Sequence, residues 1–197
     1  MEDINICEKY ENLISKLDDS TYKHSLDTAS LCGDIASSLG CYDPEKAYTI
    51  GLLHDVGKIY IPGIILDKPD QLTPLERSII DLHSYYGYVI LKESGLEPDI
   101  TLPVLYHHSL TKPHLGGDIT EDITADVVHY TFLVHSVDVY DAMSEKRAYH
   151  NPMPVQRIMD VLSEDWMCPP EIKQELWKKG RHPPDRTNVY VVNKKIS

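Results

Sequence analysis

The stretch GLLHDVGKIYIPGIILDKPDQLTPLERSIIDLHSYYGYVIL, residues 51–91, decides the fold of this chain. Its first part has the apolar spacing of a helix that closes on His54 and Asp55. Two prolines and a glycine between residues 60 and 70 predict a loop. The run Thr73-Pro74-Leu75-Glu76 has the pattern of a capping box with proline at the first helical position. We therefore expect a second helix from this run to about Leu91.

The helical pattern continues on both sides of this stretch. Gly40 is a typical helix stop, and Asp43-Pro44 is a typical helix start. A second loop is expected at residues 112–122, where one proline and two glycines occur. The spacing of apolar residues predicts helices over residues 3–17, 21–39, 44–54, 73–91, 98–108, 125–143, 155–162 and 170–179.

The pattern predicts an all-α protein. The chain lacks the strand signals of a doubly wound sheet and has no G-x-x-x-x-G-K phosphate loop. We expect one helical bundle of about seven to nine helices in a single domain over residues 1–197, with its core at about 21–180. Residues 181–197 are expected to form a loose tail, in which VYVV at 189–192 is a candidate short strand.

Composition excludes several classes of partner. The 197 residues include 19 Lys and Arg against 31 Asp and Glu, a net charge of −12. Such a surface repels nucleic acid and anionic lipid, so bulk nucleic acid and membranes are not expected partners. No apolar run reaches the ~18 residues of a membrane span, and the start has no secretory signal. The four cysteines form no C-x-x-C pair, which is typical of reduced thiols. We expect a cytoplasmic protein.

Ten histidines make a metal site worth testing. Several of them lie on different expected helices, and a helical bundle can direct such side chains to one interior point. A lone helical histidine, however, is more often an ordinary core or surface residue. Neighbours on a helix also point about 100° apart, so adjacent pairs need a helix end to face one site. Spacing alone therefore leaves a metal site and ordinary histidines equally open. His135 is interpreted as a core or surface residue.

The stretch at residues 51–91 resembles the HD superfamily of metal-dependent phosphohydrolases. It is most similar to the HD-GYP branch, whose members carry HD-x-G-K-I, an I-P loop, K-P, L-T-x-x-E and H-x-x-x-G at similar places. The downstream run SVDVYDAMSEKRAYH, residues 136–150, resembles the ADVYDAL-type segment of that branch with its following Arg-x-Tyr. The resemblance covers roughly residues 23–179.

The resemblance implies two divalent transition-metal ions. Iron or manganese is favoured, with nickel, cobalt and zinc also open, because imidazole ligands suit these ions better than magnesium. Asp55 would bridge the ions, and Asp55 and Lys58 are the expected catalytic residues. Lys58 and Arg147 are expected to bind substrate phosphate, although Lys58 is also explained by the helix dipole and Arg147 by a solvated loop. The implied metal ligands are His24, His54, Asp55, His83, His107, His108 and Asp138.

Two departures from the HD-GYP pattern bear on function. The segment HHSLTKPHLGGDITEDI after the histidine pair lacks D-G-x-G-Y-P, a motif that helps shape the cyclic di-GMP pocket. Ser20 stands where some members have a Glu that supports a third metal, so we expect two.

The resemblance implies a metal-dependent phosphohydrolase in which a metal-bridged hydroxide cleaves a phosphate ester of a nucleotide or related small molecule. The two metals would lie about 3.5–4 Å apart. One alternative is a cyclic dinucleotide phosphodiesterase, acting on a substrate such as cyclic di-GMP with an altered loop. A second alternative is a catalytically silent nucleotide-binding regulatory module.

Overall fold

The computed structural model describes residues 6–110, 119, 121–144 and 152–181. Within these residues the chain forms α-helices and one 3-10 helix, with no strand, so the predicted all-α class is confirmed. The elements are α1 (Ile6–Ile14), α2 (Asp19–Leu39), α3 (Pro44–Leu53), η1 (Val56–Tyr60), α4 (Gly63–Leu66), α5 (Pro74–Asp81), α6 (His83–Glu93), α7 (Pro98–Tyr106), α8 (Ala125–Ser144), α9 (Val155–Glu164) and α10 (Pro170–Arg181).

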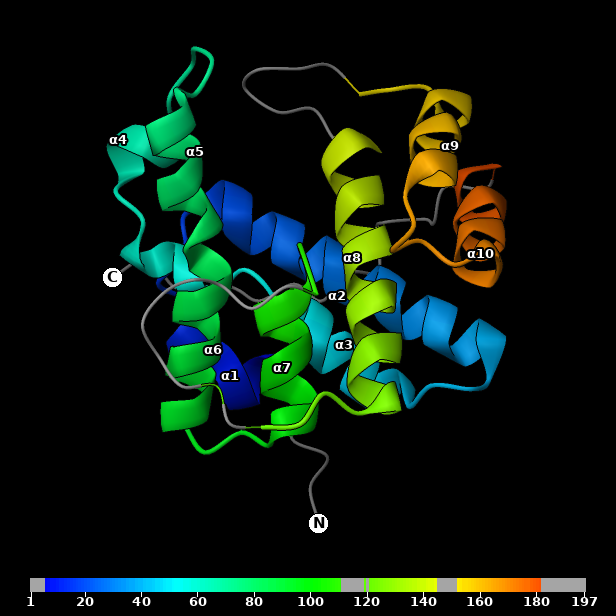
Figure 1. The fold of residues 1–197 in the computed structure, drawn as a ribbon, viewed down its shortest axis with the longest axis horizontal. Coiled ribbons are helices and arrows are strands. Elements are labelled where there is room, and N and C mark those ends of the chain that lie inside the picture. Colours follow the sequence, from blue (N-terminus) through cyan, green and yellow to red (C-terminus); the bar gives the residue numbers. More distant parts are fainter. Residues whose placement is uncertain (1–5, 111–118, 120, 145–151, 182–197) are drawn as a thin grey trace.

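The long helices α2 and α8 are the centre of the arrangement (Figure 1). Helix α2 packs against α3 and α8, and α7 packs against both α6 and α8. Helices α9 and α10 lie together beyond α8, while α4 and α5 project on the opposite side of the molecule. The main core lies between these layers and includes the fully buried Ile35, Leu53, Leu133 and Leu162.

Local sequence signals set the helix boundaries as expected. Asp43 accepts hydrogen bonds from the main-chain N–H groups of Glu45 and Lys46 at the start of α3. Thr73 and Glu76 form the capping box of α5, and Gly40 ends α2 in the left-handed region at φ 68°. These residues provide hydrogen bonds for main-chain N–H and C=O groups at the helix ends, which have no partner within the helix.

Two predictions about residues 60–91 were wrong in detail. The expected loop at residues 60–70 contains the short helix α4, because Ile65 N–H bonds the carbonyl of Pro62 and closes a helical turn. The expected continuous helix from Thr73 breaks at Leu82 into α5 and α6. At that break Nδ1 of the His83 ring lies 2.6 Å from the main-chain carbonyl oxygen of Ile80, three residues earlier.

Two glycines permit close packing around the centre of the molecule. A Cβ atom on Gly51 would lie 2.9 Å from the Cα of Ala29, so α2 and α3 approach closely only because Gly51 has no side chain. A Cβ atom on Gly57 would collide with main-chain atoms of His83 and Gly87. This second approach seats η1 against the start of α6.

No helix in the described part of the chain is both long and apolar enough to cross a membrane. The expected strand at 189–192 and the tail at 182–197 lie outside the described residues, as does most of the expected loop at 112–122.

Candidate metal centre

Helix ends direct three imidazoles to one place. His54 and His107 directly follow the last residues of α3 and α7, and His83 begins α6. In each ring Nδ1 lies at hydrogen-bond distance from the main-chain carbonyl three residues earlier. The acceptors are Gly51 at 2.7 Å, Ile80 at 2.6 Å and Val104 at 2.6 Å. A carbonyl only accepts, so Nδ1 carries the proton, and in the neutral ring the Nε2 lone pair is free for a ligand.

A first group of ligand atoms lies between α2, α8 and the end of α3. It comprises His24, His54 and Asp138, whose ligand atoms lie within 4.8 Å of one another. Nε2 of His24 is 2.9 Å from Oδ1 of Asp138. Nδ1 of the same ring donates to Oδ2 of Asp141 at 2.7 Å, which fixes the ring from behind. The three side chains of the group and that of Asp141 are all buried.

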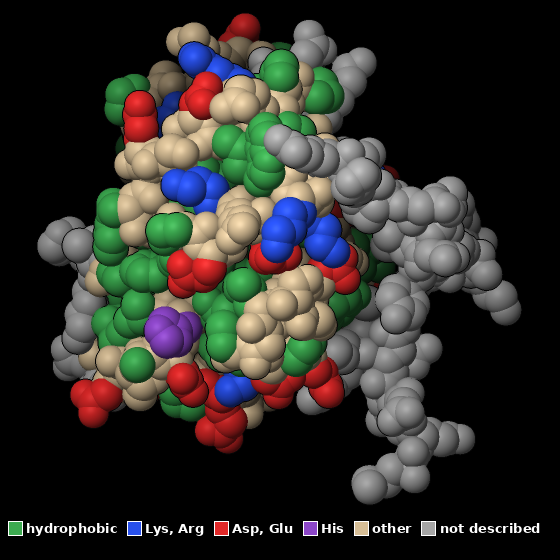
Figure 2. Space-filling view, turned by 90° about the vertical axis from the view of Figure 1, so that its right-hand side faces the viewer, with side chains coloured by type: hydrophobic (Ala, Val, Ile, Leu, Met, Phe, Trp, Pro, Cys, Tyr) green, Lys and Arg blue, Asp and Glu red, His purple; other side chains and the backbone are tan. Residues whose placement is uncertain are grey.

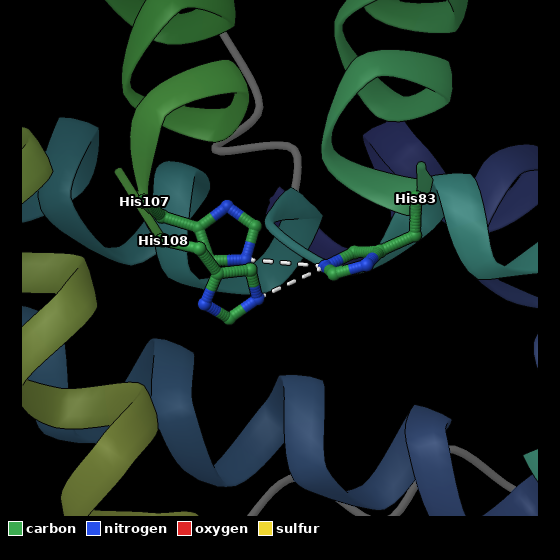
Figure 3. A group of neighbouring side chains, drawn as sticks. All are labelled: His83, His107 and His108. Carbon is green, nitrogen blue, oxygen red and sulfur yellow. Dashed lines mark hydrogen bonds between the residues drawn. The ribbon is translucent and has the colours of Figure 1, made fainter. Parts of the chain in front are cut away.

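A second group is made of three imidazoles. Figure 3 shows His83 at the start of α6 facing His107 and His108, which follow α7. Nε2 of His83 lies 3.3 Å from Nε2 of His107 and 3.2 Å from Nε2 of His108. His83 and His107 are buried, whereas the side chain of His108 is 44% exposed. The centre therefore reaches solvent at His108.

The carboxylate of Asp55 lies between the two groups. Its Oδ2 atom is 3.3 Å from Nε2 of His54, and its Oδ1 atom is 3.3 Å from Nε2 of His83. Lys58 on η1 donates from Nζ to Oδ2 at 2.6 Å. Asp55 thus directs one oxygen toward each group, which is the arrangement a bridging carboxylate needs.

The first group, together with the adjacent Asp55, attracts positive charge. Burial raises the pKa of Asp55, but Lys58 and His54 outweigh it and hold the pKa well below its usual value. Burial opposes ionisation of Asp138 too, yet the hydrogen bond from His24 and the positive charge of the neighbouring His54 ring keep its pKa well below the usual range. Burial lowers the pKa of His54, but Asp55 and Asp138 raise it to about 10. Two ionised carboxylates therefore favour a cation here, whether a proton or a metal ion.

The second group consists of neutral imidazoles. Burial lowers the pKa of His83 to about 3, since the opposing effect of Asp55 is smaller and Lys58 adds to the shift. Burial and the neighbouring rings of His108 and His83 also hold the pKa of His107 well below its usual value. Neutral imidazole is the form that binds a metal ion, so these rings are ready ligands without losing a proton.

The residues present fit a divalent metal. Nε2 of His54 is buried and, within the described part of the chain, has no hydrogen-bond partner. Such an atom costs free energy unless something satisfies it. The imidazole and carboxylate set suits iron, manganese, cobalt, nickel or zinc better than magnesium, which prefers oxygen ligands and water.

The structure brings together all seven residues that the resemblance implied as ligands, and it places Lys58 beside them. Arg147 lies outside the described residues. The sequence reasoning missed Asp141, although its position three residues after Asp138 on one helix was a usable signal. His135, interpreted as a core or surface residue, is indeed buried, but it also contacts the main chain of His107.

Comparison with known proteins identifies a family and several relatives, among them phosphodiesterases of cyclic dinucleotides. The family model described as "HD domain" matches residues 21–167. The 3'3'-cGAMP-specific phosphodiesterase 1 of Vibrio cholerae is 26% identical over 160 residues, which are 80% of this chain and 36% of that protein. The cyclic di-GMP phosphodiesterase of Thermotoga maritima is 30% identical over 162 residues, 79% of this chain and 41% of that protein. The chain thus spans well under half the length of these relatives.

A solved structure supports the fold. The HD domain of the L. monocytogenes phosphodiesterase PgpH, in complex with cyclic-di-AMP, matches with a TM-score of 0.63 and 21% sequence identity. The match covers 87% of this chain and 97% of that one. At this level of identity the likeness concerns the arrangement of the helices.

Proposed function

Because the chain belongs to the HD domain family, we propose that it is a metal-dependent phosphohydrolase that cleaves a phosphate ester of a nucleotide or related small molecule. The observation that carries the proposal is the position of Asp55, with one carboxylate oxygen toward His54 and the other toward His83. We assign His24, His54, Asp55 and Asp138 to one divalent ion. We assign Asp55, His83, His107 and His108 to the other. Iron and manganese are the favoured ions.

The bound ions would supply Lewis-acid activation of water and of the phosphoryl group. The chain's own residues orient and neutralise the substrate. Lys58 is 17% exposed at its side chain, so its ammonium group borders the centre and can donate to a phosphoryl oxygen. We propose that substrate enters at His108, where the centre meets solvent. Arg147 is proposed as a second phosphate contact.

The substrate class follows from charge as well as chemistry. The net charge of −12 disfavours long polyanions such as nucleic acid. On the face shown in Figure 2, the Lys and Arg side chains of the described residues are interspersed with acidic ones and form no continuous basic surface. A small phosphate ester avoids most of this repulsion. Free thiols at Cys32, Cys41 and Cys168 fit the cytoplasmic location that we propose with it.

A cyclic dinucleotide is the specific alternative substrate. The printed names of the V. cholerae and T. maritima relatives describe phosphodiesterases for 3'3'-cGAMP and cyclic di-GMP. The missing D-G-x-G-Y-P motif after His108 weighs against carrying cyclic di-GMP over directly.

A turnover assay tests both candidates. Protein loaded with Mn²⁺ or Fe²⁺ is incubated with phosphomonoesters, linear nucleotides and cyclic dinucleotides, and His83→Ala serves as the matched inactive variant. We expect wild-type protein to release product from at least one substrate and the variant to release none. Binding of a nucleotide without any cleavage would instead favour the silent regulatory module.

A further inference from the structure

The imidazole of His135 joins the metal centre to a distant loop. His135 lies on α8, is 8% exposed and does not belong to either ligand group. Its Nδ1 atom is 2.6 Å from the main-chain oxygen of His107, and its Nε2 atom is 2.7 Å from Oδ2 of Asp165. Asp165 lies between α9 and α10, so a single side chain connects α7, α8 and the α9–α10 connection.

Both ring nitrogens of His135 lie at hydrogen-bond distance from an oxygen atom of another segment. A carbonyl oxygen only accepts hydrogen bonds, so Nδ1 of His135 is the donor to the main chain of His107, while Nε2 lies within hydrogen-bond distance of the Asp165 carboxylate. Burial raises the pKa of Asp165, but hydrogen bonds from His135 and from the N–H of Met167 lower it below its usual value. Oδ1 of Asp165 accepts that N–H at 2.9 Å, so the carboxylate is itself held by the main chain. Charge-assisted hydrogen bonds of this kind are strong and directional.

The hydrogen bond from His135 reaches the main chain of a proposed metal ligand, His107. Helix α7 ends at Tyr106, so the carbonyl of His107 lies where a helix leaves its acceptors without helical partners. The ring of His107 is fixed separately, through Nδ1 to Val104. Because His108 follows directly in the chain, a shift of the His107 main chain would displace two of the three imidazoles of the second group.

We propose that His135, held in place by Asp165, is a positioning residue that fixes the main chain at His107 and thereby aims His107 and His108 at the metal. The inference rests on the proposed metal-dependent function. His135 acts through the main chain of a ligand and does not itself face the ligand groups, because both of its ring nitrogens are occupied.

The test measures metal affinity, which a purely structural role of His135 would leave unchanged. Full-length protein freed of metal is titrated with Co²⁺ in competition with a chelator, and the visible absorption of bound Co²⁺ reports ligand geometry. We expect His135→Leu to weaken Co²⁺ binding by about 10- to 100-fold, the usual cost of losing an outer partner of a ligand, and to change the absorption bands. His135→Asn keeps an N–H near the position of Nδ1 and should restore much of the affinity.

Thr131→Val is the matched control. Thr131 is buried one turn earlier on α8, and its hydroxyl bonds the carbonyl of Val127 on the same helix. This variant should lower the melting temperature yet bind Co²⁺ as the wild type does. If His135→Leu does not fold, Asp165→Ala should show a smaller loss of affinity. Wild-type affinity and spectrum in every folded His135 or Asp165 variant would overturn the inference. A wild-type protein that binds no Co²⁺ would overturn the proposed metal centre itself.

Discussion

The Nζ atom of Lys58 lies 2.6 Å from Oδ2 of Asp55, three residues earlier in the chain. The chain continues past Asp55 as the 3-10 helix η1, and residues three apart in such a helix lie on the same side. The ammonium group therefore sits on the carboxylate that faces both ligand groups. This placement is more specific than a general attraction between a lysine and the end of a helix.

Replacing Lys58 should separate binding of metal from catalysis. Lys58→Ala removes a donor to the phosphoryl group but none of the proposed ligands. We expect metal content to stay at the wild-type level and kcat to fall by about 10²- to 10³-fold, as when one preorganised donor is lost. Parallel metal analysis and steady-state kinetics measure both. An unchanged kcat would mean that Lys58 has no catalytic role and only interacts favourably with the helix dipole.

Adding one methyl group at Gly57 should disrupt the centre without touching a ligand. The new Cβ would meet main-chain atoms of His83 and Gly87, so η1 must move away from α6 and separate Asp55 from His83. We expect Gly57→Ala to destabilise the fold by about 1–3 kcal/mol or more and to reduce metal content. Gly63→Ala is the control, since its nearest neighbour to a Cβ is the side chain of Asp67 at 3.6 Å. Equal unfolding midpoints and metal contents in the two variants would contradict this view of η1.

Asp141 should support metal binding through His24. Its Oδ2 accepts the Nδ1 proton of His24 and so keeps Nε2 directed at the first group. Asp141→Ala should weaken metal binding by about 10- to 100-fold. Asp141→Asn retains a neutral acceptor and should lose less. Chelator competition gives both affinities, and the prediction fails if the alanine variant matches the wild type.

The capping box of α5 should make stability depend on acid pH. Lys68 and the hydrogen bonds from Thr73 lower the pKa of Glu76 from 4.5 to about 2. A carboxyl with a depressed folded-state pKa stabilises the fold above its unfolded pKa, and this contribution disappears as pH falls toward about 2. Glu76→Gln should therefore melt below the wild type at neutral pH, and the gap should close on acidification. A gap independent of pH in thermal melts would exclude this linkage.

The sequence predicted helix ends better than the inner structure of the centre. Asp43, Gly40 and the Thr73–Glu76 box act through neighbours in the chain, so their roles were visible locally. The break at Leu82 coincides with a contact between the His83 ring and the carbonyl of Ile80, which forms in the folded centre. Local pattern could not predict it.

The ligand set was implied by resemblance to a family, since spacing alone left the histidines undecided. Supporting contacts were harder to foresee because they join distant segments. His24 and Asp141 lie 117 positions apart, and His135 and Asp165 lie 30 apart. Only the packing of α2 against α8, and of α8 against α9 and α10, brings such partners together.

The most direct test of the central claim is the number of metal ions per chain in protein purified without chelator, measured by elemental analysis for wild type and for Asp55→Ala. We predict close to two transition-metal ions per wild-type chain and a large loss from both positions in the variant, because Asp55 faces both groups. Wild-type protein that takes up no metal when Mn²⁺ or Fe²⁺ is supplied without oxygen would contradict the account, as would full metal content in Asp55→Ala.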